Sequence, residues 1–266
     1  MIELSTITAL GTILLVLMII VGGKQGWLAF LSLGLNFFYF YLGLILVALR
    51  VPPLWITLVM GTIILATIIF MGTEDLKISI SAFESAIIVM VIVVVLVLLT
   101  EHFIQATGFS LENSNELEGM SILIGISYVK IGEMTMILSC LGAVAELSVA
   151  LASGLIEICK RNTDVPAHTL MKSGIEMGSH IIGTTLNTLL LGFLGNFLAL
   201  FIWFIGLNYS FATVMNNKIL VTELVTVLIS FIGVIIAVPF TTGLVILNSQ
   251  KRVDNNQENQ YYTTND

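Results

Sequence analysis

Long uninterrupted apolar runs are the feature that most constrains how this chain folds. The run from Ala86 to Leu99 has no polar side chain, and similar runs recur along the sequence. A bilayer core about 30 Å thick requires about 20 apolar residues in a helix to cross it, so such runs predict membrane-spanning helices. The composition agrees, since 57% of the residues are hydrophobic and only 10% are charged. We therefore expect an all-α, polytopic membrane protein that forms one helical bundle.

Hydropathy along the chain predicts about seven membrane-spanning helices. Turn residues and charges separate them, as at Gly22-Gly23-Lys24 and at Pro52-Pro53. The expected spans are residues 5–22, 27–50, 53–71, 84–104, 134–159, 180–206 and 219–247. Residues 1–248 form the expected transmembrane domain. Residues 249–266 are polar with almost no aliphatic side chains, which predicts a disordered cytoplasmic tail.

Lysine and arginine residues are distributed unequally between the two ends of these spans. If the N-terminus lies outside and the C-terminus inside, the cytoplasmic side receives Lys24, Lys77, Lys160, Arg161, Lys172, Lys251 and Arg252. The outer side receives only Arg50, Lys130 and Lys218. Positive charge favours the cytoplasmic side, which predicts this orientation in the lipid bilayer. The net charge is −7 and no basic cluster is present, so nucleic acid is not an expected partner.

One outer segment, 107–133, does not fit a simple helix. Its first part, LENSNELEG, is acidic and typical of a turn, and the following SILIGISYVKI is apolar but too short to cross a membrane as a helix. Isoleucine and tyrosine side chains alternate in this second part, so a short strand or an interfacial lid is possible.

Glu146 is the one carboxylate in the apolar stretch from Leu141 to Leu155. An ionised carboxylate at the centre of a bilayer costs about 3 kcal/mol, so such residues usually face protein or a water-filled path. On a helix, Gly142, Glu146 and Ser153 share a face of small and polar residues, which predicts close packing against another helix. The carboxyl group either takes up and releases protons in an ion pathway, or stays protonated and hydrogen-bonded in a structural role.

The next predicted span carries a polar face that could meet Glu146. His180, Thr184, Asn187 and Thr188 recur at helical spacing, and Gly174, Gly178 and Gly183 would allow a close approach of another helix. In an antiparallel pair, Glu146 and Asn187 should lie at similar depth. His180, nearer the cytoplasm, could exchange protons. The alternatives are an interfacial role for His180 and ordinary helix packing for the threonines and glycines.

Few other residues are candidates for a functional site. Glu223, near the outer end of the last span, is a further candidate for an ion pathway. Cys140 and Cys159 are about 28 Å apart on one predicted helix, so they cannot form a disulfide with each other. No His/Cys set has the spacing of a metal site, and no motif for a cofactor or a catalytic nucleophile is present. We expect no metal, no cofactor and no enzymatic activity.

Three blocks in the second half of the chain carry a family resemblance. They are LGAVAELSVALASGLIEI, SGIEMGSHIIGTTLNTLLLGFLGN and TELVTVLISFIGVIIAVPFTTGL, with Pro166 between the first two. Together they resemble the YibE/F-like family of bacterial multi-pass membrane proteins, over a core of residues 134–248. The resemblance implies a bacterial plasma membrane, a transport-related role, and pairing with a paralogous membrane subunit. The family pattern has Asp where this chain has Glu146, and Arg-Asp where it has Ser179-His180.

Three functions remain open from the sequence. The first is a subunit of a proton- or ion-coupled transporter or exporter of a small solute or ion, which requires Glu146 to titrate. The second is an accessory or scaffold membrane subunit that packs against a paralogue, which requires only that Glu146 be hydrogen-bonded. An intramembrane enzyme is a more distant alternative.

Overall fold

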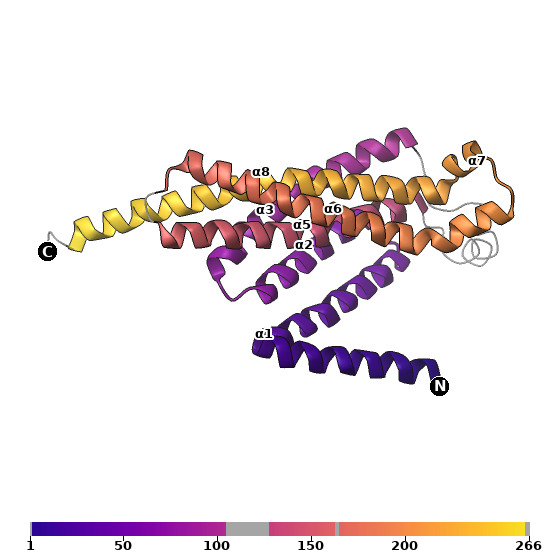
Figure 1. The fold of residues 1–266 in the computed structure, drawn as a ribbon, viewed down its shortest axis with the longest axis horizontal. Coiled ribbons are helices and arrows are strands. Elements are labelled where there is room, and N and C mark those ends of the chain that lie inside the picture. Colours follow the sequence, from indigo (N-terminus) through magenta and orange to yellow (C-terminus); the bar gives the residue numbers. More distant parts are fainter. Residues whose placement is uncertain (1, 105–127, 163–164, 264–266) are drawn as a thin grey trace.

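The computed structural model describes residues 2–104, 128–162 and 165–263, and every regular element in these ranges is a helix. The helices are α1 (Ile2–Ala48), α2 (Pro53–Gly72), α3 (Leu76–Ile104), α5 (Tyr128–Arg161), α6 (Ala167–Gly206), α7 (Phe211–Met215) and α8 (Lys218–Thr263). All except the short α7 are long and apolar enough to cross a membrane. The predicted all-α, multi-pass membrane fold is therefore confirmed (Figure 1).

α1 consists of two helical arms joined by a sharp break at Gly23. Gly23 has φ 56° and ψ −128°, a conformation that only glycine adopts easily. A Cβ on Gly26 would overlap the backbone of Met18, so glycine also allows the two arms to meet at the bend. A straight helix of 47 residues would be about 70 Å long, more than twice the thickness of a bilayer core. The break divides it into arms of 2–22 and 24–48, close to the first two predicted spans (Figure 1).

The described lysines and arginines gather at the two ends of the bundle. The bend of α1 lies beside the end of α2, where Gln25 Nε2 donates to the Met71 carbonyl at 2.9 Å. The turn that follows α2 is joined to the end of α5, where Lys160 Nζ donates to Asp75 Oδ2 at 2.9 Å. We call this the basic end; it contains Lys24, Lys77, Lys160, Arg161 and Lys172. At the opposite end lie Arg50, Lys130 and Lys218, and we call it the outer end after the predicted orientation.

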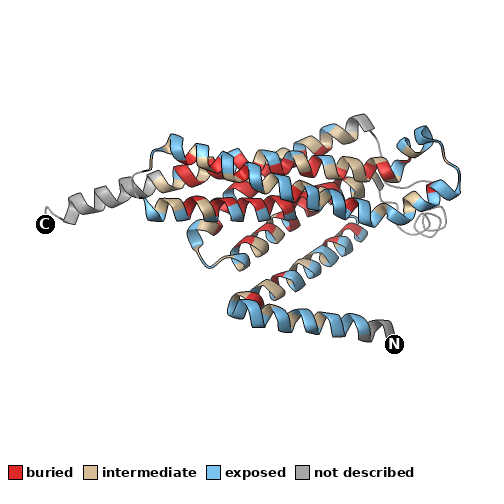
Figure 2. Cartoon of the chain, in the orientation of Figure 1, coloured by how far each residue is buried: buried red, intermediate tan, exposed pale blue. Residues whose placement is uncertain are grey.

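α5 is the central helix of the bundle. It contacts α2, α3, α6 and α8, and it is the most buried of the long helices. Buried side chains concentrate where α3, α5 and α8 meet, whereas the first arm of α1 is exposed along the described part of its length (Figure 2). Cys140, Val144, Leu147 and Leu151 form the fully buried side of α5. This core leaves the other side of α5 without cover.

Two expectations about helix ends require correction. The tail at 249–266, predicted to be disordered, instead continues α8 as far as Thr263. The reason is that α8 is already nucleated by packing and contains neither glycine nor proline after Gly243, so each further residue extends an existing helix. Helices α3, α5 and α6 begin several residues before the predicted spans, because hydropathy detects only the apolar part of a helix. Of the outer segment 107–133, residues 128–133 are the first turns of α5, and the remainder lies outside the described residues.

Candidate functional site

Glu146 lies about halfway along α5, on the exposed side of that helix. The spacing of the exposed positions follows the helical repeat, opposite the buried side. We call these residues the α5 stripe: Ser139, Gly142, Glu146, Ala150, Ser153 and Glu157. Small side chains dominate this stripe, and Glu146 is its one carboxylate away from a helix end.

The prediction that Glu146 is buried against the following helix is wrong for the single chain. Glu146 is exposed, and it has no hydrogen bond or ion pair with any described residue. Its expected partners bind carbonyls of their own helix: Thr184 Oγ1 donates to Ile181 at 2.9 Å, and Asn187 Nδ2 donates to Gly183 at 2.9 Å. The bulky side of α5 fills the bundle core, which turns its small side outward.

The polar residues of α6 are exposed as well. We call His180, Thr184, Asn187 and Thr188 the α6 stripe. Thr188 Oγ1 donates to the Thr184 carbonyl at 3.0 Å, so this hydroxyl also finds its acceptor within α6. Such bonds satisfy polar side chains without a neighbouring helix. The α6 stripe is therefore polar, exposed and largely satisfied by its own backbone.

The two stripes border the line where α5 and α6 meet. A Cβ on Gly154 of α5 would overlap the Met177 side chain of α6, which identifies a point of close contact between the two helices. The helices are antiparallel, so Glu146, which precedes Gly154, and the α6 stripe, which follows Met177, both lie beyond this contact on the side away from the loop that joins α5 and α6. The α6 stripe begins three residues beyond Met177, on the same side of α6. Glu146 and the polar residues of α6 are thus exposed on two neighbouring helices.

The candidate packing residues divide into two groups. Gly174 and Gly178 are buried against α8, where an added Cβ would fall 2.5 Å from Thr242 Oγ1 and from Val238 Cγ1, respectively. Gly142 and Gly183 are exposed, and an added Cβ would meet no described heavy atom within 4 Å. Ser153 is exposed too. Gly174 and Gly178 therefore pack closely within the chain, whereas Gly142, Gly183 and Ser153 do not.

Glu223 is half-buried near the N-terminus of α8 and is not brought near Glu146. α5 and α8 run parallel, and the hydrogen bond from Thr241 Oγ1 to Ser148 Oγ sets a 93-residue offset between them. With this offset Glu146 lies level with Pro239, about 24 Å along the axis from Glu223. These two carboxylates do not form one site within the chain.

Sequence reasoning missed a buried polar cluster in the core. Ser85 of α3 and Thr241 of α8 share a hydrogen bond of 2.7 Å, and Thr241 Oγ1 donates to Ser148 Oγ of α5 at 3.2 Å. All three side chains are fully buried. We call them the hydroxyl cluster. It joins three helices in the interior, where a polar group without a partner would be costly.

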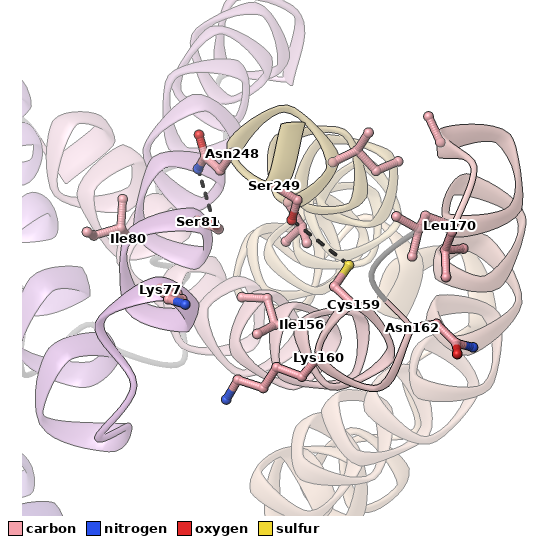
Figure 3. Close-up of a pocket in the computed structure, with 14 residues that line it drawn as sticks. Lys77, Ile80, Ser81, Ile156, Cys159, Lys160, Asn162, Leu170, Asn248 and Ser249 are labelled. Atoms are coloured by element: carbon pink, nitrogen blue, oxygen red, sulfur yellow. Dashed lines mark hydrogen bonds between the residues drawn. The ribbon is translucent and has the colours of Figure 1, made fainter. Parts of the chain in front are cut away.

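A cavity of about 550 Å³ lies at the basic end between α3, α5, α6 and α8, and we call it the cup (Figure 3). Lys77, Ser81, Cys159, Lys160 and Asn248 are among its lining residues. Near the cup, Asp75 accepts hydrogen bonds from Lys160 Nζ and from the Lys77 backbone N–H, each at 2.9 Å. These bonds, that of Lys160 foremost, hold the pKa of Asp75 below its usual value.

Metal ligands are not grouped in the described parts of the chain. There, no three His, Cys, Asp or Glu side chains lie close enough together to hold a metal ion. Cys140 is fully buried and Cys159 half-buried, and both are free thiols.

Comparison with protein families gives one match. A family model described as "YibE/F-like protein" matches residues 10–251, which extends the likeness from the second half of the chain to nearly all of it. No curated protein and no solved structure matches.

Proposed function

The chain belongs to the YibE/F-like family of membrane proteins, and on that premise we propose that it is a subunit of a proton- or ion-coupled transporter or exporter. Its substrate would be a small solute or ion. Its second subunit would be a paralogous membrane protein that covers the α5 and α6 stripes. The protein would cross a bacterial plasma membrane seven times, with its N-terminus outside and the basic end in the cytoplasm.

The exposure of Glu146 is the observation that carries this proposal. A carboxylate halfway along a membrane-spanning helix, facing lipid, would cost about 3 kcal/mol on insertion scales. A second subunit on this face would remove that cost. A carboxyl group in such an interface is also one of the few groups inside a membrane that can take up and release a proton. His180, toward the basic end of the same surface, would exchange protons with the cytoplasm.

The number of passes is supported by the break in α1. The two arms of α1 and the five other long helices provide seven segments of sufficient length. The positive-inside rule supports the orientation, because the basic end has more lysine and arginine than the outer end.

Proton flux into vesicles that contain the complex tests the role of Glu146. Glu146→Gln preserves shape and hydrogen bonding but cannot ionise, so it should reduce proton-linked flux at least about a hundredfold. Glu157→Gln is the matched control, because Glu157 lies on the same stripe at the basic end, exposed and paired with Arg161 at 2.9 Å. Flux should survive that change. Normal flux and pH dependence in Glu146→Gln would remove Glu146 from the mechanism.

An accessory subunit without transport activity is the second candidate. The hydrogen bonds of the α6 stripe to its own backbone favour it, because these side chains then need no solute to satisfy them. In that case Glu146→Gln would leave proton flux unchanged. If the Glu146→Gln variant instead failed to fold, or lost its partner on size-exclusion chromatography, the carboxyl group of Glu146 would have a structural role.

A further inference from the structure

We propose that the cup at the basic end is a binding site for a small organic anion with an apolar body. The cup lies away from Glu146, so this proposal concerns binding alone and does not depend on proton coupling. Its volume of about 550 Å³ falls within the range of sites that hold small molecules.

The charge of the lining favours an anion. Lys77 and Lys160 line the cup, and none of its lining residues is acidic. Lys160 is paired with Asp75, whereas the Lys77 ammonium has no partner among the described residues. Two further carboxylates lie close by outside the lining: Glu84 accepts a hydrogen bond from Asn248 Nδ2 at 3.0 Å, and Glu157 is paired with Arg161 at 2.9 Å. The lining itself therefore carries two positive side chains and no negative one.

The remaining walls favour an apolar body. Half of the lining residues are aliphatic: Ile80, Ile156, Val165, Ala167, Leu170, Val245 and Ile246. The walls come from α3, α5, α6 and α8, and each neighbouring pair of these helices is in contact. Labelled side chains of all four helices surround the cup in Figure 3.

Three hydrogen bonds hold the polar wall in place. Asn248 Nδ2 donates one hydrogen bond to Ser81 Oγ at 3.1 Å and one to Glu84. Both hydrogens of the Asn248 amide group are therefore used. Ser249 Oγ donates to Cys159 Sγ at 3.9 Å. A wall fixed in this way reduces the entropy that a ligand must remove on binding.

Cys159 provides a native reporter for the cup, because the other cysteine, Cys140, is fully buried. In inside-out membrane vesicles, its reaction rates with anionic (sulfonatoethyl) and cationic (trimethylammonioethyl) methanethiosulfonates are measured, each relative to the rate of free 2-mercaptoethanol. We expect the anionic reagent to be favoured about fivefold. Cys159→Ser, which should abolish the labelling, shows that the signal comes from this thiol.

Lys77→Gln should bring the ratio of the anionic to the cationic reaction rate at Cys159 close to unity. Lys172→Gln should leave this ratio unchanged. Lys172 is an exposed lysine at the same end that does not line the cup, which makes it the matched control. A ratio near unity in the unmodified chain would overturn the proposal. So would an equal fall in both variants, because it would reflect general surface charge.

Protection of Cys159 from the neutral hydroxyethyl reagent tests the ligand class. Hexanesulfonate should slow the reaction at least about threefold, and inorganic sulfate and hexyltrimethylammonium should not. Equal protection by the cation, or none by hexanesulfonate, would contradict the proposal. The protein is compared in vesicles of phosphatidylcholine with and without phosphatidylglycerol. Equal protection by hexanesulfonate in both kinds of vesicle supports a soluble ligand. Protection by phosphatidylglycerol alone would overturn the proposal in favour of a lipid headgroup.

Discussion

Asp75 shows at the scale of one residue how the basic end is held together. Its carboxylate joins the turn after α2 to the end of α5 through Lys160 and also caps the Lys77 backbone N–H. Because folding lowers its pKa, this residue contributes stability above the ordinary value of 3.8 and loses that contribution as the pH falls through the lowered pKa.

We therefore expect Asp75→Asn to lower the midpoint of thermal unfolding at pH 6. The difference from the unmodified protein should disappear as the pH falls below 3.8 and through the lowered pKa. Thermal unfolding in detergent between pH 3 and pH 6 measures this. A difference that persists unchanged at the lowest pH would show that the carboxylate charge is irrelevant to the effect.

The hydroxyl cluster gives a second prediction about a single residue. Thr241→Val keeps the shape of the side chain but leaves Ser85 and Ser148 without their shared partner, so we expect a loss of about 1–2 kcal/mol in the free energy of unfolding. Thr226→Val is the control, since Thr226 Oγ1 bonds only the Thr222 carbonyl of its own helix, at 2.9 Å. Equal losses in reversible denaturation would argue against a special role for the cluster.

At the scale of the helix, the sequence predicts where the spans lie better than which way they face. Pro53 at the start of α2 and Gly206 at the end of α6 agree with the predicted boundaries, because apolar runs and turn residues determine them. The outward direction of Glu146 could not be predicted, since lipid and protein interior are equally apolar and hydropathy does not tell one side of α5 from the other. Ser85, Ser148 and Thr241 resembled the many hydroxyls that bond their own helix.

The glycines of α6 give a prediction that separates its two sides. Gly178→Ala places a Cβ 2.5 Å from Val238 and should cost about 1–3 kcal/mol in stability by displacing α6 from α8. Gly183→Ala meets no described atom within 4 Å, and alanine favours a helix, so the isolated chain should be as stable or more stable. Unfolding of the two purified variants measures this. Similar destabilisation by both would contradict the exposed position of Gly183.

At the scale of the whole molecule, the bundle has one well-packed core and one polar face without cover. The core lies where α3, α5 and α8 meet, and the α5 and α6 stripes form the polar face. In water such a face would be an ordinary surface. In a bilayer it places a carboxylate and several polar side chains toward lipid, which is why we infer a second membrane subunit on this face and not elsewhere.

Photo-crosslinking in the membranes of the native host tests that inference most directly. Ala150, on the α5 stripe, is replaced by p-benzoylphenylalanine, and Val95, an exposed apolar residue of α3, receives the same residue as a control. After irradiation, the tagged chain is purified and its adducts are identified by mass spectrometry. We predict a second, paralogous multi-pass protein crosslinked at position 150 and no protein crosslinked at position 95. Lipid adducts alone at both positions, or a crosslink only to another copy of this chain, would contradict the account.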